Sequence, residues 1–437
     1  MISRKTTARV LAGVAGFAAF ALAMTGCSGS GASAGGSTTI SLLAGGNDTV
    51  STTFAKDLAD AFHKANPKIT VKVETRPGGT DGDNLIKTRL STQSMNDVFL
   101  YNSGSLFQAL HPDTALQPLT DEPWAKDLTD DFKKTVSTDK GLYGAPQGTT
   151  FDGGIMYNKK VYAQLGLSVP TTWAEFISNS EKIKAAGKTA VIVSYGDTWT
   201  SQLFVLADFA NIAAQDSNWA DDYTNNKARY ADEPAFAGFE HTREIFDKGL
   251  ENKDYASLTN VNALKMLATG EGVQYPMTTS VIGNVVQSNP DQVDDIGYFA
   301  IPSDDTEPHA TVWEANGAYI PRSTTGDKLA AAKKLVAFIN SPDGCKIQNE
   351  AGTAAGPFAT SACAVPDDAP ALVQDELKYQ QDGKTSPALE FLSPVKGPNL
   401  EKILIQVGSG ISSAKQGADL YDKDVKAQAQ QLGLKGW

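Results

Sequence analysis

TTISLLAGGNDTVSTTFAKDLADAFHKANPKITVKV, residues 38–73, contains a strand, a helix and a second strand in that order. A short apolar run at 40–43 is followed by glycine and asparagine, which is typical of a strand that ends in a loop. Apolar residues then recur at every fourth position and predict an amphipathic helix over 52–65, built on Phe54, Leu58 and Phe62. Asn66-Pro67 ends this helix, and the alternation of apolar and polar residues over 69–73 predicts the next strand.

The same succession of strands and helices continues along the chain. Apolar runs predict strands at 98–101, 142–146, 154–157 and 190–194, and helical periodicity predicts helices over 171–186 and 329–339. Strands that alternate with helices form an α/β fold with a mostly parallel sheet. Ligands of such sheets bind beyond the carboxyl ends of the strands. The loops at 45–48 and 102–105 are therefore candidate edges of a binding site.

Three polar residues stand at these strand ends, namely Asn47, Asp48 and Asn102. We treat them as candidate ligand contacts, because amides and carboxylates offer the hydrogen-bonding groups that a polar ligand needs. Asn and Asp also favour turns for purely local reasons, so turn formation remains the alternative for each of them.

Residues 1–26 have the features of a secretory signal. A basic start precedes an apolar run at 10–24, which is too short for a membrane-spanning helix of about 20 residues. Thr25-Gly26-Cys27 resembles a bacterial lipobox, in which the chain is cut before the cysteine and the thiol takes a diacylglycerol. We expect Cys27 to carry lipid and residues 27–37, all of them small, to form a flexible tether at the outer membrane face. An ordinary signal peptide with a chance cysteine is the alternative.

Composition describes an ordinary globular protein with room for two or more domains, since 437 residues include 41% hydrophobic and 20% charged side chains. The net charge of −12 argues against a nucleic acid as partner. With Cys27 lipidated, Cys345 and Cys363 remain of the three cysteines, and in an oxidising compartment we expect them to form a disulfide. Two free thiols are the alternative.

Catalytic and metal-binding motifs are absent from the sequence. The four histidines are far apart and none has the spacing of a metal site, and no G-x-S-x-G nucleophile motif occurs. We therefore expect no metal, no cofactor and no catalytic residue. A glycosidase with paired carboxylates stays open, because such residues need no fixed spacing.

Three motifs in the middle of the chain carry a family resemblance. GLYGAP at 141–146 leads through MYNKK at 156–160 to VPTTWAEF at 169–176. This combination resembles the extracellular solute-binding proteins of ABC importers, in the sugar-binding branch that includes maltose-binding protein. The resemblance covers nearly all of the chain after the tether. It implies a monomer that delivers its ligand to an ABC permease in the cell membrane.

The resemblance also implies a two-lobed, periplasmic-binding-protein-like α/β fold that closes on its ligand by hinge bending. The hinge crossings are expected near 148–152, 312–317 and 352–357. The first lobe would then contain residues 38–148 and 317–352, and the second lobe residues 149–316 and 353–437. The ligand would lie in the cleft between them.

The resemblance points to a carbohydrate ligand, and residues near the expected cleft and hinges suit one. Aromatic rings cover the apolar faces of sugars, and carboxylates accept hydrogen bonds from their hydroxyls. We expect ring contacts from Phe151, Trp199 and Trp313, and hydroxyl contacts from Asp152 and Glu314. Packing inside the second lobe is the alternative for Trp199, and hinge packing is the alternative for Trp313.

Thr278 and Ser280 follow the strand after Gly270 and complete the candidate ligand contacts. Many sugar-binding relatives have a tryptophan where this chain has Ser280, so we expect a short oligosaccharide rather than a long one. A secreted enzyme acting on polysaccharide, or the same fold binding a peptide or polyol, remains the alternative function.

Overall fold

The computed structural model describes residues 37–46, 48–351, 356–365 and 369–437. Asn47 and Cys27 lie outside the described residues, together with the expected signal at 1–26, residues 27–36 of the expected tether and residues 352–355 of the third expected crossing. In the described part of the chain, no helix is long and apolar enough to cross a membrane.

Within the described residues there are two large sheets, and the first has the strand order β2-β1-β3-β12-β6. Its strands are β1 (Thr38–Gly45), β2 (Ile69–Arg76), β3 (Val98–Tyr101), β6 (Gly144–Gln147) and β12 (Asn316–Tyr319). Strand β1 pairs with β2 and β3 in parallel, and β12 runs antiparallel to β3 and β6. The helices and the small β4–β5 hairpin that go with this sheet are α1 (Thr49–Ala65), α2 (Gly79–Ser91), α3 (Ser105–Gln108), α4 (Pro112–Ala115), η1 (Pro123–Asp127), α5 (Asp130–Thr135), β4 (Ser137–Thr138), β5 (Gly141–Leu142), α14 (Gly326–Ile339) and α15 (Pro342–Glu350).

The second sheet has the order β13-β11-β7-β9-β8, and β10 pairs with β7. Its strands are β7 (Phe151–Asn158), β8 (Thr189–Val191), β9 (Gly272–Thr278), β10 (Ile296–Phe299), β11 (Ala310–Trp313) and β13 (Thr385–Pro387). Strand β7 runs antiparallel to β9, β10 and β11, so the predicted mostly parallel arrangement is wrong for this sheet. Periodicity identifies strands but not their partners, and the connections here are long enough for either direction.

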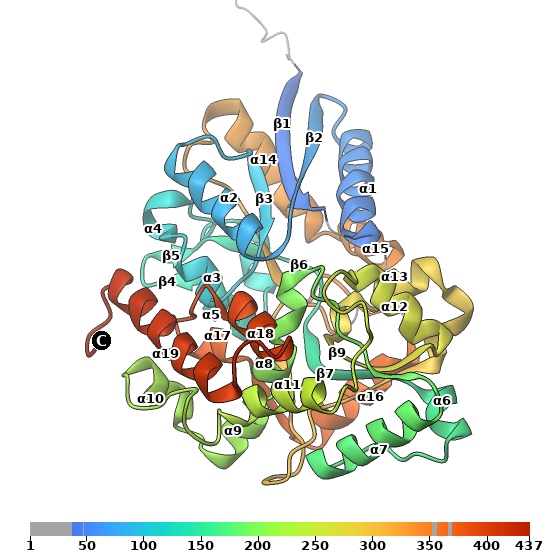
Figure 1. The fold of residues 1–437 in the computed structure, drawn as a ribbon. Helices are drawn as coiled ribbons and strands as arrows, with labels where there is room; N and C mark the ends of the chain where they lie inside the picture. Colours follow the sequence, from blue (N-terminus) through green and yellow to red (C-terminus); the bar gives the residue numbers. More distant parts are fainter. Residues whose placement is uncertain (1–36, 47, 352–355, 366–368) are drawn as a thin grey trace, which may run out of the picture. The chain divides into compact units, whose positions relative to one another are not determined.

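The remaining helices accompany the second sheet (Figure 1). They are α6 (Lys159–Gln164), α7 (Trp173–Ala185), η2 (Thr198–Gln202), α8 (Leu203–Leu206), α9 (Phe209–Gln215), α10 (Trp219–Thr224), α11 (Ala237–Asp247), α12 (Asn260–Thr269), η3 (Thr279–Val281), α13 (Ile282–Ser288), η4 (Pro290–Asp295), α16 (Ala371–Gln381), α17 (Leu389–Leu392), α18 (Leu400–Gly408) and α19 (Ala414–Gln431).

Each sheet has its own hydrophobic core. One core contains residues from 40–145 and 315–351 together with Ala359, and the other three clusters contain residues from 151–313 and 369–437. We call the first sheet with its core the first lobe, and the second sheet with its cores the second lobe. The chain passes between the sheets at 148–150, after β6, and at 314–315, after β11.

The predicted helices are present, with ends fixed by capping residues. Helix α1 begins at Thr49, before the predicted position 52, because the Asp48 carboxylate accepts a hydrogen bond from the Ser51 amide at 2.7 Å and caps the helix. Helix α7 begins at Trp173, where Thr172 and Glu175 form a capping box. Trp173 itself is buried in the second lobe.

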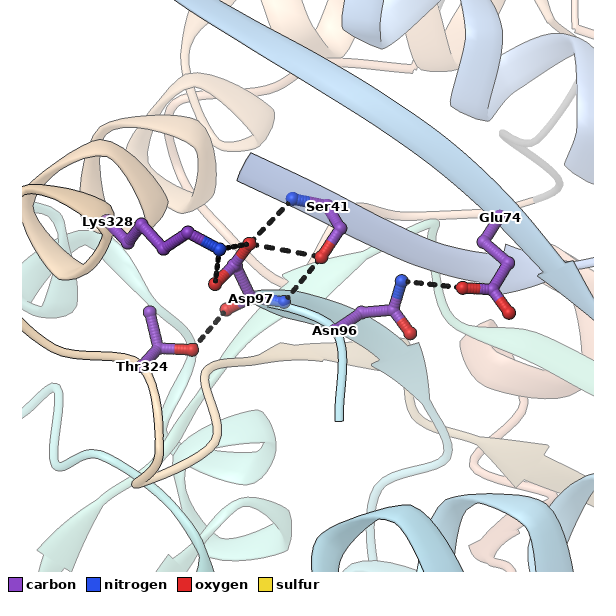
Figure 2. A network of polar contacts seen from close by, with 6 residues as sticks. All are labelled: Ser41, Glu74, Asn96, Asp97, Thr324 and Lys328. Carbon is purple, nitrogen blue, oxygen red and sulfur yellow. Dashed lines mark hydrogen bonds and ion pairs between the residues drawn. The ribbon is translucent and has the colours of Figure 1, made fainter. Parts of the chain in front are cut away.

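A polar network fastens the first sheet at the end opposite the loops that follow β1 and β3. Figure 2 shows Asp97, directly before β3, between Ser41 of β1 and Lys328 of α14. Its carboxylate accepts hydrogen bonds from the Ser41 amide at 2.8 Å and from Lys328 Nζ at 3.1 Å. Strand β1 and helix α14, which are far apart in the sequence, are therefore both bound to the residue that precedes β3.

A disulfide joins Cys345 of α15 to Cys363, with their Cα atoms 5.4 Å apart. The residues just before Cys363 contact the first lobe, since the Ser361 amide donates to the Asp127 carbonyl at 2.8 Å and Ala359 belongs to the first core. The disulfide thus fastens this segment to the last helix of the first lobe.

Candidate functional site

A cavity of about 370 Å³ lies between the two lobes. Its wall in the first lobe follows the carboxyl ends of β1, β2 and β3 and the start of α2. In the second lobe the wall is formed by the ends of β7 and β11, by η2 and by the segment from α17 to α18. The loops after β1 and β3, which the sequence indicated, therefore do face a cavity.

The cavity brings together most of the residues that the sequence singled out. Seven of them line it: Asp48, Asn102, Phe151, Trp199, Thr278, Ser280 and Trp313. They come from six separate segments of the chain, which only the folded structure places side by side.

Phe151 and Trp313 form an aromatic wall in this cavity. Their rings are parallel within 3° and their centroids are 6.2 Å apart. The two residues face each other across the antiparallel pair β7–β11. Gly153 makes room for the indole, since a Cβ at this position would lie 2.3 Å from Cζ3 of Trp313. Trp313 is 8% exposed, so it packs in a core cluster of the second lobe and also reaches the cavity.

Trp199 lies in the short helix η2. It is half-buried, packs against a core cluster of the second lobe and lines the cavity with part of its surface. The two interpretations of this residue, packing and cavity lining, therefore both hold.

The polar candidates have local partners in addition to their place on the wall. Asp48 caps α1, as described above. The backbone carbonyl of Asn102 accepts a hydrogen bond from the Tyr319 hydroxyl at 3.0 Å. The hydroxyls of Thr278 and Ser280 are 2.9 Å apart and hydrogen-bonded to each other.

Asp152 lies outside the cavity lining, in contrast to the expectation. Successive side chains of a strand point to opposite faces, so Asp152 points away from the cavity that Phe151 lines. It is 1% exposed, and burial raises its pKa to about 7. Burial also raises the pKa of Glu376 in α16, and the negative charge of Asp152 raises it further. These two groups form a buried acidic pair inside the second lobe.

Glu314 also lies outside the lining. It follows Trp313 directly and is turned toward α5 of the first lobe, where it interacts electrostatically with Asp131 and Lys134. Burial raises its pKa to about 7, the charge of Asp131 adds to the rise, and Lys134 opposes it. Glu314 thus lies in the segment between β11 and β12 and does not line the cavity.

The first lobe contributes cavity residues that the sequence analysis missed. The Arg76 guanidinium lies 5.4 Å from the centroid of the Tyr101 ring, and Asp83 is close to both. Burial lowers the pKa of Arg76 and raises that of Asp83, and their opposite charges reduce both shifts. Arg76 and Tyr101 could have been found, because each is the last residue of a strand that ends at the cleft.

The C-terminal segment of the second lobe supplies three more charged groups. Lys396 forms an ion pair with Glu390 at 3.3 Å, and Glu401 accepts a hydrogen bond from the Thr198 hydroxyl at 2.6 Å. All three line the cavity. No sequence pattern pointed to them, because about 200 residues separate Thr198 from Glu401 and only the fold joins them.

Comparison with known proteins identifies the family whose sequences this chain matches. The sequence profile of the family described as "Bacterial extracellular solute-binding protein" matches residues 46–345. The multiple sugar-binding protein of Streptococcus mutans serotype c is 25% identical over 289 residues, which cover 65% of this chain and 67% of that protein. The melibiose/raffinose/stachyose-binding protein MelE of Bacillus subtilis is 24% identical over 356 residues, covering 79% of this chain and 78% of the relative.

Solved structures show the same fold. A chitin oligosaccharide binding protein superimposes with a TM-score of 0.77 at 16% identity, covering 90% of this chain and 100% of the other. RafE in complex with raffinose superimposes with a TM-score of 0.71 at 21% identity, covering 91% of this chain and 100% of the RafE chain. The two-lobed fold inferred from the sequence is confirmed.

Proposed function

The chain belongs to the bacterial extracellular solute-binding protein family, and on this premise we propose that it captures a short oligosaccharide between its lobes and delivers it to an ABC permease. The observation that carries the choice of ligand is the aromatic wall of Phe151 and Trp313 in a cavity that also contains charged and amide side chains. Sugars combine apolar C–H faces with hydroxyl groups, and this wall and these polar groups complement the two kinds of surface.

The names of the relatives support the same ligand class. Both relatives with significant sequence similarity are described as sugar-binding proteins, and one of them as binding melibiose, raffinose and stachyose. Ser280 stands in the cavity wall without a ring, so this position adds no stacking surface to that of Phe151, Trp313 and the exposed part of Trp199. We therefore favour a ligand of a few sugar units.

The positions of the hinges are part of the proposal. We place two crossings at 148–150 and 314–315, between the strands of the two sheets. Because residues 358–361 pack on the first lobe and the disulfide holds Cys363 to it, we place the third crossing after Cys363, later than the 352–357 expected from the sequence. Closure of the lobes about these segments would enclose the sugar.

The membrane anchor is a further part of the proposal. A lipid on Cys27 and a tether at 27–37 would keep the protein beside its permease. Replacing Cys27 with Ala should move the protein from the membrane fraction to the medium or leave the uncut precursor. Membrane retention of a cleaved, lipid-free Cys27→Ala protein would contradict the anchor.

A thermal-shift screen tests the ligand class. The panel contains melibiose, raffinose, stachyose, chitin oligosaccharides and xylo-oligosaccharides, with a tripeptide and sorbitol as the competing classes. A sugar at one hundred times its Kd should stabilise the folded protein by about 2.7 kcal/mol. Chromatography after overnight incubation separates binding from enzymatic activity: a binding protein returns its sugar unchanged, whereas an enzyme would release shorter products.

A further inference from the structure

Glu401 of the second lobe lies against the first turn of α2, which belongs to the first lobe. Glu401 is 8% exposed, on α18, and accepts the hydrogen bond from the Thr198 hydroxyl at 2.6 Å. A Cβ built on Gly79, the first residue of α2, would lie 2.9 Å from Oε2 and 3.3 Å from Oε1 of Glu401. The carboxylate thus occupies the space beside Gly79 across the boundary between the lobes.

The start of α2 is a favourable place for this carboxylate. The N-terminus of a helix has a partial positive charge and backbone N–H groups that the helix itself does not satisfy. The N-cap of α2 is Gly78, which has no side chain that could cap the helix. A negative charge supplied by the other lobe therefore stabilises this helix end, and it can do so only while the lobes are together.

A second contact joins the same two segments. The Thr80 hydroxyl donates to the Pro398 carbonyl at 3.4 Å. The chain just before α18 and the first turn of α2 therefore meet at more than one point. Glu401 is the charged member of this contact.

Glu401 is also tied to the element that holds a cavity ring. Helix η2 begins at Thr198, which donates to the Glu401 carboxylate, and the Ser201 hydroxyl donates to the Glu401 carbonyl at 3.0 Å. Trp199 lies between these two residues and lines the cavity. One side chain thus contacts both the support of Trp199 and the opposite lobe.

We propose that Glu401 is a latch that couples the position of Trp199 to closure of the lobes, a role that rests on the proposed capture of a sugar between them. When the lobes close, the carboxylate meets the positive end of α2 and stabilises the closed state. When they open, that contact is lost while the bond to Thr198 remains. Glu401 acts here as a positioning residue for binding.

Gly79→Ala tests the latch by filling the space that the carboxylate occupies. Gly79 has φ +61°, so alanine is strained there, and this strain needs a control. Gly326→Ala supplies it, because Gly326 is likewise the first residue of a first-lobe helix, has φ +57° and has no atom within 4 Å of the added Cβ. The difference between the two variants reports the contact with Glu401 and with the Thr198 hydroxyl bonded to it, whose Oγ1 would lie 3.1 Å from the added Cβ.

Calorimetry with raffinose and small-angle X-ray scattering give the readouts. We expect Gly79→Ala to raise the Kd for raffinose at least about tenfold over Gly326→Ala and to keep a larger radius of gyration at saturating raffinose. Glu401→Gln, which removes the charge and keeps the size of the side chain, should raise the Kd about two- to fivefold and lower the Tm only slightly. Equal Kd and equal radius of gyration for Gly79→Ala and Gly326→Ala would overturn the latch.

Hydrogen–deuterium exchange decides the latch even when no sugar is bound. In ligand-free protein, Glu401→Ala should speed the exchange of amides 79–82 relative to Lys402→Ala, which changes an exposed neighbour on the same helix. Equal exchange in the two variants would overturn the latch. If the wild type binds neither raffinose nor another sugar of the panel, the proposed ligand class fails, and the exchange result still accepts or rejects the latch.

Discussion

The rings of Phe151 and Trp313 lie parallel within 3°, with centroids 6.2 Å apart, at the point where β7 and β11 meet the cavity. Both strands lead directly into the segments that join the two lobes. The aromatic wall therefore borders two of the proposed hinge segments, so a ligand stacked on it would contact residues beside the segments about which we propose that the lobes move.

Trp199→Ala should weaken sugar binding and leave the fold nearly intact. The ring is half-buried and lines the cavity, so its loss removes a stacking face rather than a core residue. If it is a hot spot, we expect a loss of about 2 kcal/mol, a roughly thirtyfold rise in Kd measured by calorimetry. Trp437→Ala is the matched control, because this tryptophan packs in the second lobe outside the cavity and should leave the Kd unchanged.

The buried acidic pair predicts a stability that falls as the pH rises. The folded pKa of Asp152 is raised from 3.8 to about 7, so between these values the folded protein holds a proton that the unfolded chain has released. Stability is lost as the pH rises from about 4 toward 7, by at most about 1.4 kcal/mol per pH unit for one group. Denaturation of wild type and Asp152→Asn over this range should show the variant gaining relative stability with pH, and a constant difference would contradict this account.

Asp97→Ala should destabilise the protein far more than Lys328→Ala. Removal of the carboxylate leaves the Ser41 amide and hydroxyl without their acceptor, which we expect to cost about 2–3 kcal/mol. The Lys328 side chain is 56% exposed, so its truncation should cost less than about 1 kcal/mol. Urea denaturation measures both, and equal losses would show that the charge pair rather than the bonds to Ser41 holds the network (Figure 2).

Loss of the disulfide should lower stability without abolishing binding. The sequence separation of 18 between Cys345 and Cys363 corresponds to about 3 kcal/mol on the chain-entropy model. Neither cysteine lines the cavity, so the double variant Cys345→Ser, Cys363→Ser should bind sugar with an unchanged Kd below its Tm. Labelling of both thiols in unreduced, unfolded wild type would show that the bond does not form in the protein.

The sequence predicted the parts of the fold and site that depend on local pattern. Alternating strands and helices, the α1 periodicity and the strand-end residues Asp48 and Asn102 follow from spacing alone, and these residues do line the cavity. Trp199, Phe151 and Trp313 were found through the family resemblance, and they lie in the same cavity.

The parts that the sequence missed depend on side-chain direction and distant contacts. Asp152 was expected beside Phe151 in the cleft, but adjacent residues of a strand point to opposite faces, so only one of the two could be there. The alternation of side chains along a strand could have shown in advance that only one of the two residues faces the cavity, although it could not have shown which one. Glu401 is brought to the cavity by the packing of α18 on η2, for which no local pattern exists.

Calorimetric titration of the wild-type protein with melibiose, raffinose and stachyose, alongside a tripeptide, tests the central claim most directly. The account predicts saturable binding of one sugar molecule per chain, a Kd that rises in Trp199→Ala but not in Trp437→Ala, and no heat of binding with the tripeptide. Saturable binding of the tripeptide with no response to any sugar, or sugar binding that is equally tight in Trp199→Ala and Trp313→Ala, would contradict it.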